Sequence, residues 1–238
     1  MKPLIVALDV EPNESKKIVK ELSAHIEIFK VGSRLFTSMG PQIVEWIQKF
    51  HRKVFLDLKF HDIPQTVLES CKAAVRMKVW ALTVHTSGGF AMMKEAVRAT
   101  QKESKRLHCP KPFIFGVTVL TSLQDKELKE VGVSQPTLLQ VKQLALLAQK
   151  SGLDGVIASG NEIRVIREVC GNEFLIGVPG IRLVGKERED QKRIVTPETA
   201  YKLGANYLIV GRPILNSQDP VATTKEILNV FSTYKQTS

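Results

Sequence analysis

The sequence predicts an α/β fold, specifically a (β/α)8 or TIM barrel, from three observations. Eight short apolar runs alternate with eight helix-like segments along the 238 residues. The apolar runs are continuous rather than alternating, which is typical of parallel strands buried on both faces. The length also agrees, since a TIM barrel takes about 250 residues. No Ser/Gly-rich linker or shift in composition interrupts the pattern, so we expect a single TIM-barrel domain over residues 1–238.

The strands of this barrel can be placed one by one from the apolar runs. A doubly wound open sheet is the competing fold, but it usually has fewer strands, and no G-x-G-x-x-G follows the first run. The predicted strands are residues 4–9, 26–32, 53–59, 81–85, 113–120, 155–159, 174–178 and 206–211.

A helix is predicted after each strand. Asn13 is a candidate N-cap for the first helix, and Pro41 is compatible with the first turn of the second. The predicted helices are residues 13–24, 41–50, 64–78, 89–104, 136–152, 161–170, 197–204 and 219–232.

The composition is that of an ordinary folded protein, with 43% hydrophobic and 24% charged residues. No apolar run approaches the roughly 20 residues needed to span a bilayer, so no membrane association is expected. The N-terminal apolar run is short and meets Asp9, which favours a first strand over a signal peptide. Cys71, Cys109 and Cys170 are far apart, which predicts a reducing, cytoplasmic location and no structural zinc site.

The formal net charge of +10 suits anionic partners, either nucleic acid or a phosphorylated small molecule. Lysines and arginines are spread along the whole chain, with no basic run and no interleaved aromatic residues. A solvated basic surface is therefore the simpler interpretation, and no nucleic-acid partner is expected. A basic nucleic-acid-binding barrel remains the alternative from another functional class.

Charged residues occur where the predicted strands end, which is where TIM barrels carry their functional groups. Asp57 and Lys59 are two apart and project from the same face of one strand. Asp9 and Lys30 end the two preceding strands, and Asp62 follows the third. Because charges at a barrel mouth are costly to desolvate unless paired, we expect a network of alternating Asp and Lys. Ion pairs that only tie strands together are one alternative; a magnesium site is another, disfavoured because Lys59 would compete with the cation.

The last two units carry a phosphate-binding pattern. Gly180 and Arg182 follow the seventh predicted strand, and Gly211 and Arg212 follow the eighth. In TIM barrels these loops commonly hold a phosphate. Glycine lets backbone N–H groups approach the anion, and arginine can donate two hydrogen bonds to it.

The segment from 180 to 196 is long for a barrel loop and rich in charge. Beside a phosphate site, such a segment is typical of a lid that orders on binding. Gln191 would then be buried against the ligand. A solvated loop is the alternative.

The stretch "VFLDLKFHDIPQTV" closely resembles the D-x-K-x-x-D-[IV]-[PGAS]-x-T signature of the orotidine 5′-phosphate decarboxylase family. "VALD", "FKVG", "VTVLTS", "VPGIR" and "IVGRPI" resemble the family's other landmarks in the same order, so the resemblance covers nearly the whole chain. It implies a homodimeric TIM barrel that converts orotidine 5′-monophosphate to UMP and CO2, the last step of de novo pyrimidine biosynthesis. It also implies no cofactor and no metal.

The resemblance also assigns roles to residues. It implies that Lys59 protonates C6 of the pyrimidine, that Asp57 faces the substrate carboxylate, and that Asp62 is catalytic. Asp62 and Thr66 would extend across the dimer interface into the active site of the partner subunit, so that each site contains residues of both subunits. The implied substrate contacts are Asp9 and Lys30 for the ribose, Thr121 and Ser122 for the base, and Arg182, Gln191, Gly211 and Arg212 for the phosphate.

A sister group is the nearest alternative within this resemblance. The 3-keto-gulonate 6-phosphate decarboxylases and hexulose-phosphate synthases share D-x-K-x-x-D but use Mg2+ and sugar phosphates. The continuation Ile63-Pro64-Gln65-Thr66 and the pair Thr121-Ser122 favour the nucleotide enzyme.

Overall fold

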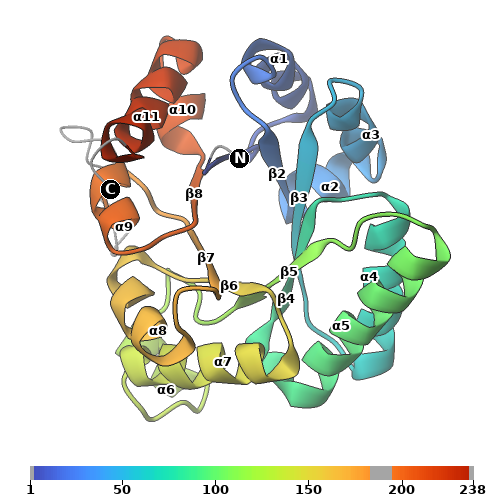
Figure 1. Ribbon diagram of the computed structural model, residues 1–238, viewed down its shortest axis with the longest axis vertical. Helices are drawn as coiled ribbons and strands as arrows, with labels where there is room; N and C mark the ends of the chain where they lie inside the picture. The colour runs from blue at the N-terminus through green and yellow to red at the C-terminus, as the bar shows by residue number, and fades with distance from the viewer. Residues whose placement is uncertain (1–2, 183–194, 236–238) are drawn as a thin grey trace.

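The computed structural model describes residues 3–182 and 195–235, and these form a closed parallel barrel with strand order β1 to β8 (Figure 1). β1 pairs with β8 in parallel, for example Ile5 with Ile209, and this pairing closes the barrel. The predicted (β/α)8 fold is therefore confirmed. The strands are β1 (Leu4–Ala7), β2 (Ile28–Gly32), β3 (Lys53–Phe60), β4 (Ala81–His85), β5 (Phe113–Val117), β6 (Gly155–Ile157), β7 (Leu175–Val178) and β8 (Tyr207–Val210).

Helices surround the barrel, and each of the eight predicted helices is present (Figure 1). They are α1 (Pro12–Leu22), α3 (Gln42–Gln48), α4 (Pro64–Arg76), α5 (Gly89–Arg106), α7 (Thr137–Ser151), α8 (Ile163–Cys170), α9 (Pro197–Lys202) and α11 (Pro220–Lys235). Short helices that the sequence pattern did not indicate are α2 (Ser33–Met39), α6 (Asp125–Glu130), α10 (Arg212–Leu215) and the 3-10 turns η1 (Thr86–Gly88) and η2 (Gly160–Glu162).

The first helix begins earlier than the sequence suggested. Glu11 occupies the N-cap position, and Pro12 is the first helical residue. The prediction of Asn13 as the cap is therefore wrong. Proline fits the first helical position because its ring fixes φ near the helical value and its missing N–H would have no partner there.

Aromatic side chains fill the barrel interior below its mouth. The rings of Phe55 and Phe115 lie 5.5 Å apart between centroids, and Trp80 lies 5.3 Å from Tyr207. Phe55 and Phe115 are almost completely buried and belong to the smaller of two apolar cores, which lies inside the barrel. The larger core lies between the strands and the surrounding helices. Because such interiors are close-packed, they restrict the movement of the strand ends at the mouth of the barrel.

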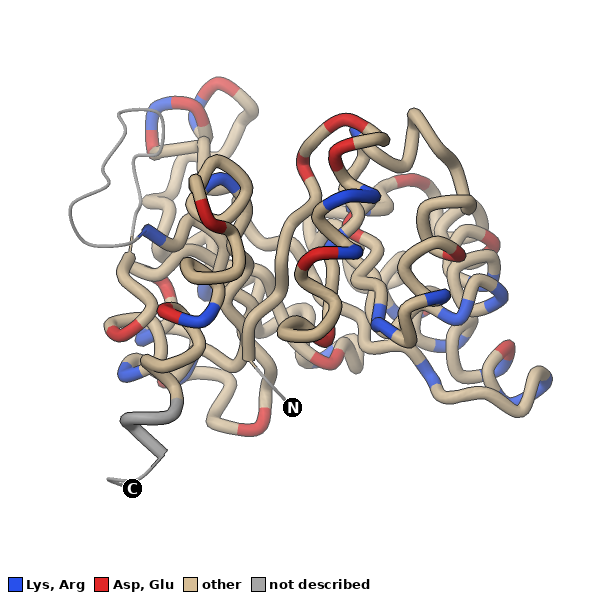
Figure 2. Tube along the Cα trace, turned by 90° about the horizontal axis from the view of Figure 1, so that it is seen from above, with Lys and Arg blue, Asp and Glu red and all other residues tan. Residues whose placement is uncertain are grey.

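Basic and acidic residues are interspersed over many helices and loops of the described trace (Figure 2). This distribution agrees with the solvated basic surface expected from the sequence. Within residues 3–182 and 195–235, no helix is both long and apolar enough to cross a membrane.

Candidate active site

Strand β3 is interrupted where its charged residues lie. Leu56 pairs with Leu82 and Phe60 pairs with Val84, so three residues of β3 lie opposite the single residue Thr83. This is a bulge, a device that re-aims side chains near active sites. Lys59 within it has φ +52°, in the left-handed region that non-glycine residues rarely adopt. The regular extended strand expected here is therefore replaced by strained backbone, and such strain concentrates at functional sites.

This strain gives a stability prediction. Lys59→Gly and Lys59→Ala both remove the ammonium group, but only glycine adopts a positive φ without a steric penalty. We expect Lys59→Gly to be more stable than Lys59→Ala by about 1 kcal/mol, measured by urea unfolding. The control is the same pair of substitutions at Lys53, in the regular part of β3, where alanine should be the more stable variant. Equal stability of the two Lys59 variants would contradict strain at this residue.

The strand ends bring four charged side chains together, as the sequence predicted. Lys30 Nζ lies 3.1 Å from Asp9 Oδ1 and 3.4 Å from Asp57 Oδ2. Lys59 Nζ lies 2.9 Å from Asp57 Oδ2. Acids and bases therefore alternate from β1 to β3, and we call Asp9, Lys30, Asp57 and Lys59 the charge array.

Mutual attraction decides the ionisation of the buried members of this array. Burial alone would raise the pKa of Asp57, but Lys30 and Lys59 outweigh it and hold that pKa below its ordinary value of 3.8. Burial alone would lower the pKa of Lys30, but Asp57 and Asp9 outweigh it and raise that pKa above 10.5. The stabilisation from Asp57 is thus lost only as pH falls through its lowered pKa, and that from Lys30 only as pH rises through its raised pKa. Both stay charged throughout the neutral range.

Two histidines lie beside the array. The rings of His61 and His85 are 5.2 Å apart between centroids. Burial lowers the pKa of His85, as do His61 and Lys59, while Asp57 opposes them. His85 is therefore neutral at neutral pH.

A cavity of about 370 Å³ opens above the charge array at the barrel mouth. Its volume is within the range of small-molecule sites. Apolar residues from facing strands, Phe55, Val117, Ile157 and Ile209 among them, form part of its wall. The predicted site residues that line it are Asp9, Lys30, Asp57, Lys59, Thr121, Arg182, Gly211 and Arg212.

The phosphate pattern lies in the wall of the same cavity. Arg182 is buried after β7, and Gly211 precedes Arg212, the first residue of α10. Gly180 has φ +76°, a conformation that glycine adopts without strain. The cavity thus joins the acid-and-base array to two arginines, Arg182 and Arg212, whose guanidinium groups suit an anion.

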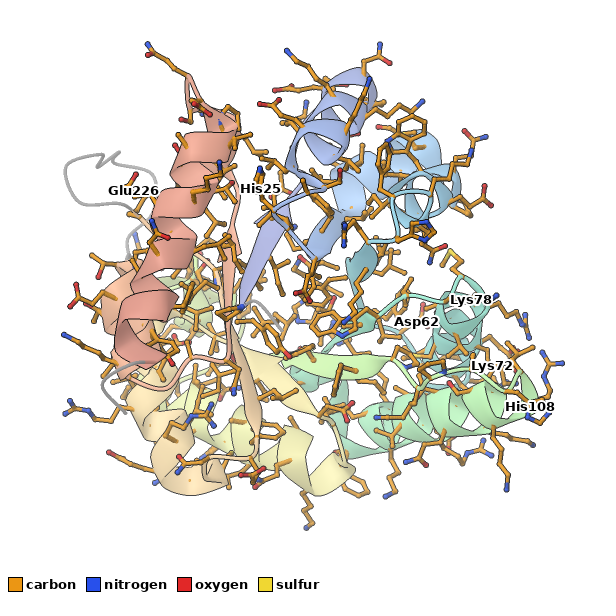
Figure 3. All side chains as sticks on the ribbon, turned by 45° about the horizontal axis from the view of Figure 1, so that its top comes forward. His25, Asp62, Lys72, Lys78, His108 and Glu226 are labelled. Carbon is orange, nitrogen blue, oxygen red and sulfur yellow. The ribbon has the colours of Figure 1, made fainter. Side chains whose placement is uncertain are left out.

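Other predicted residues lie elsewhere. Asp62, Thr66 and Ser122 are exposed and do not line this cavity. The Ile63 backbone N–H donates to Asp62 Oδ1 at 2.6 Å, and Figure 3 shows Asp62 on the side of the barrel occupied by α4 and α5. Gln191 and most of the proposed lid are outside the described residues.

Thr83 is a buried contact of the array that sequence reasoning missed. Its Oγ1 donates to Asp57 Oδ1 at 3.0 Å and accepts the Lys59 backbone N–H at 2.8 Å. The available signal was a hydroxyl in the middle of the apolar run "ALTVH". No group of three or more His, Cys, Asp or Glu side chains suited to a metal ion occurs in the part of the chain that the structure describes.

Comparisons of this chain with a protein-family model, with related sequences and with solved structures agree with the fold and motif described above. A model of the Orotidine 5'-phosphate decarboxylase / HUMPS family matches residues 2–227. The chain is 48% identical over 226 residues to orotidine 5′-phosphate decarboxylase of Moorella thermoacetica, covering 94% of this chain and 90% of that protein. It is 44% identical over 229 residues to the protein of that name from Syntrophus aciditrophicus, covering 95% of this chain and 91% of that protein.

A solved structure is also similar. That of orotidine 5′-phosphate decarboxylase from Lactobacillus acidophilus superposes with a TM-score of 0.84 at 34% identity, over 97% of this chain and 99% of that one. Motif, barrel and relatives agree over nearly the whole length. The chain belongs to the orotidine 5′-phosphate decarboxylase / HUMPS family.

Proposed function

We propose that the chain decarboxylates orotidine 5′-monophosphate to UMP and CO2 by means of the charge array. The chain is an enzyme with orotidine 5′-phosphate decarboxylase activity. It is 40–48% identical, over 94–95% of its length, to eight proteins of that name. That activity is the last step of de novo pyrimidine biosynthesis. The observation that carries the mechanism is the alternation of Asp9, Lys30, Asp57 and Lys59 in the cavity wall.

Lys59 is the proton donor in this proposal. When the bond between C6 and the carboxylate breaks, CO2 leaves and the electron pair stays on C6. The Lys59 ammonium, beside that carbon, stabilises the developing negative charge and then transfers a proton to it, which gives UMP. Solvent returns the proton to the Lys59 amine.

Asp57 faces the substrate carboxylate in this arrangement. Two like charges about 4 Å apart at an effective dielectric near 20 repel by about 4 kcal/mol. Loss of CO2 relieves that repulsion. Lys30 and Lys59, both within 3.4 Å of Asp57, keep its carboxylate charged and in place.

The rest of the cavity binds the parts of the substrate that do not react. Binding energy from a remote phosphate can offset the cost of placing the substrate carboxylate beside Asp57. The proposed contacts are Asp9 and Lys30 to the ribose, Thr121 and Ser122 to the base, and Arg182, Gln191, Gly211 and Arg212 to the phosphate.

We further propose a cytoplasmic homodimer, each chain a single catalytic domain, with active sites shared between subunits. Every residue from His61 to Thr66 is exposed, and Ile63 is 66% exposed. Asp62 and Thr66 lie outside their own chain's cavity lining, which supports a role in the site of a partner. Burial of Ile63 against a second copy would remove an exposed apolar side chain from water.

An optical assay with a chelator tests the activity and its independence from metal. Orotidine 5′-monophosphate is added to purified protein with and without EDTA, and loss of the orotate absorbance is followed. We expect the same rate in both samples, because Lys59 supplies the charge that a metal would otherwise provide. Loss of activity with EDTA, restored by Mg2+, would contradict this mechanism and favour the sugar-phosphate group of the family.

A further inference from the structure

We infer that Thr83 is a positioning residue for the decarboxylation, holding Asp57 and Lys59 in their reactive arrangement from behind the cavity. The inference rests on the proposed function. Thr83 lies in the middle of β4, is completely buried and does not line the cavity. It therefore acts on the substrate only through the two residues that it contacts.

The bulge in β3 creates the need for this side chain. Residues 57–59 have only Thr83 opposite them, so the regular ladder between β3 and β4 is broken there. The backbone N–H of Lys59 donates to Thr83 Oγ1 rather than to a strand carbonyl. An N–H buried without a partner would cost about 1–3 kcal/mol. The Thr83 hydroxyl avoids this cost and so stabilises the bulge, in which Lys59 has a positive φ.

The two hydrogen bonds of Thr83 fix its hydroxyl in one orientation. The Lys59 N–H can only donate and the ionised Asp57 carboxylate can only accept, so the hydroxyl accepts from the first and donates to the second. A valine has the shape of threonine and can do neither.

The same contacts fix the carboxylate of Asp57. Its Oδ1 accepts from Thr83, while its Oδ2 faces the ammonium groups of Lys30 and Lys59. With a partner on each oxygen, the carboxylate cannot rotate without losing one. Thr83 thus joins the main chain of Lys59 to the carboxylate that its side chain approaches.

The consequence is confined to the chemical step. Without the hydroxyl, the Lys59 backbone can relax and the Asp57 carboxylate can turn, which displaces the proton donor from C6. Arg182, Gly211 and Arg212, proposed for the phosphate, follow β7 and β8, whereas Thr83 lies on β4, whose neighbours in the barrel are β3 and β5. Ground-state binding of the nucleotide should therefore persist while turnover falls.

The experiment compares Thr83→Val, Thr83→Ser and Thr86→Val with the wild-type chain. Thr86 is the matched control, since it is also completely buried, and its hydroxyl donates to the Val117 carbonyl at 2.8 Å rather than to a member of the charge array. We expect Thr83→Val to lower kcat by about 10- to 100-fold, as misplacement of a reacting group does. The KM for orotidine 5′-monophosphate and the Kd for UMP should change by less than about threefold. Thr83→Ser should recover most of kcat, and Thr86→Val should keep it.

Several results would overturn the inference. They are a wild-type kcat in Thr83→Val, a Thr83→Ser variant as slow as Thr83→Val, or an equal loss of kcat in Thr86→Val. If Thr83→Val does not fold, Thr83→Cys replaces it, because a thiol is a weak hydrogen-bonding group of similar size, and the same loss relative to Thr83→Ser is expected. A wild-type chain that does not decarboxylate the substrate would instead overturn the proposed function.

Discussion

Replacement of Lys59 by alanine is expected to lower kcat for decarboxylation by at least about 10⁴-fold, because it removes both the proton donor and the positive charge beside C6. The fold should persist, since Asp57 retains its ion pair with Lys30 and its hydrogen bond from Thr83. Steady-state kinetics measure the loss, and circular dichroism with a thermal unfolding scan checks the fold.

Binding of UMP separates this catalytic role from a binding role. UMP lacks the C6 carboxylate, and its phosphate and ribose contacts are proposed for other residues, so its Kd should change far less than kcat. Lys53→Ala, an exposed lysine of the same strand, is the control and should keep the wild-type kcat. A Lys59→Ala variant with near-normal turnover would contradict the role of Lys59.

Mixing two inactive variants, Lys59→Ala and Asp62→Ala, is expected to restore activity. If each site takes Lys59 from one subunit and Asp62 from the other, a heterodimer has one site with both residues intact. Random pairing of equal amounts in a two-fold symmetric dimer makes about a quarter of all sites intact, so about 25% of wild-type activity should return. The measurement is kcat after unfolding and refolding the mixture.

A second mixture provides the control for this experiment. Lys59→Ala and Asp57→Ala affect residues that contact each other within one chain, so their heterodimers have no intact site. No recovery is expected there. Absence of recovery in verified heterodimers of Lys59→Ala and Asp62→Ala would contradict shared sites.

The barrel could be predicted because its signal repeats. Each parallel strand is buried on both faces, so a continuous apolar run is followed by an amphipathic helix eight times over. The short helices α2 and α6 were missed for a physical reason. Each buries a single side chain, Leu35 or Leu128, and therefore leaves no periodic pattern.

The charge array could also be predicted, because acids and bases at strand ends contradict the apolar pattern of a barrel interior. The bulge could not, since Lys59 takes a positive φ without a glycine to mark it. Thr83 was missed because threonine is a common strand residue, and its importance arises only from the bulge opposite it. The subunit that Asp62 serves depends on a second chain, which the pattern of one chain cannot place.

The most direct test of the central claim uses orotidine 5′-monophosphate labelled with 13C in its carboxylate. Purified wild-type chain in EDTA should release 13CO2 and UMP in equal amounts, and Lys59→Ala should release neither at a comparable rate. Mass spectrometry of the headspace and chromatography of the nucleotide measure the two products. Absence of 13CO2 from the wild-type chain, or its release by Lys59→Ala at a similar rate, would contradict decarboxylation by this array.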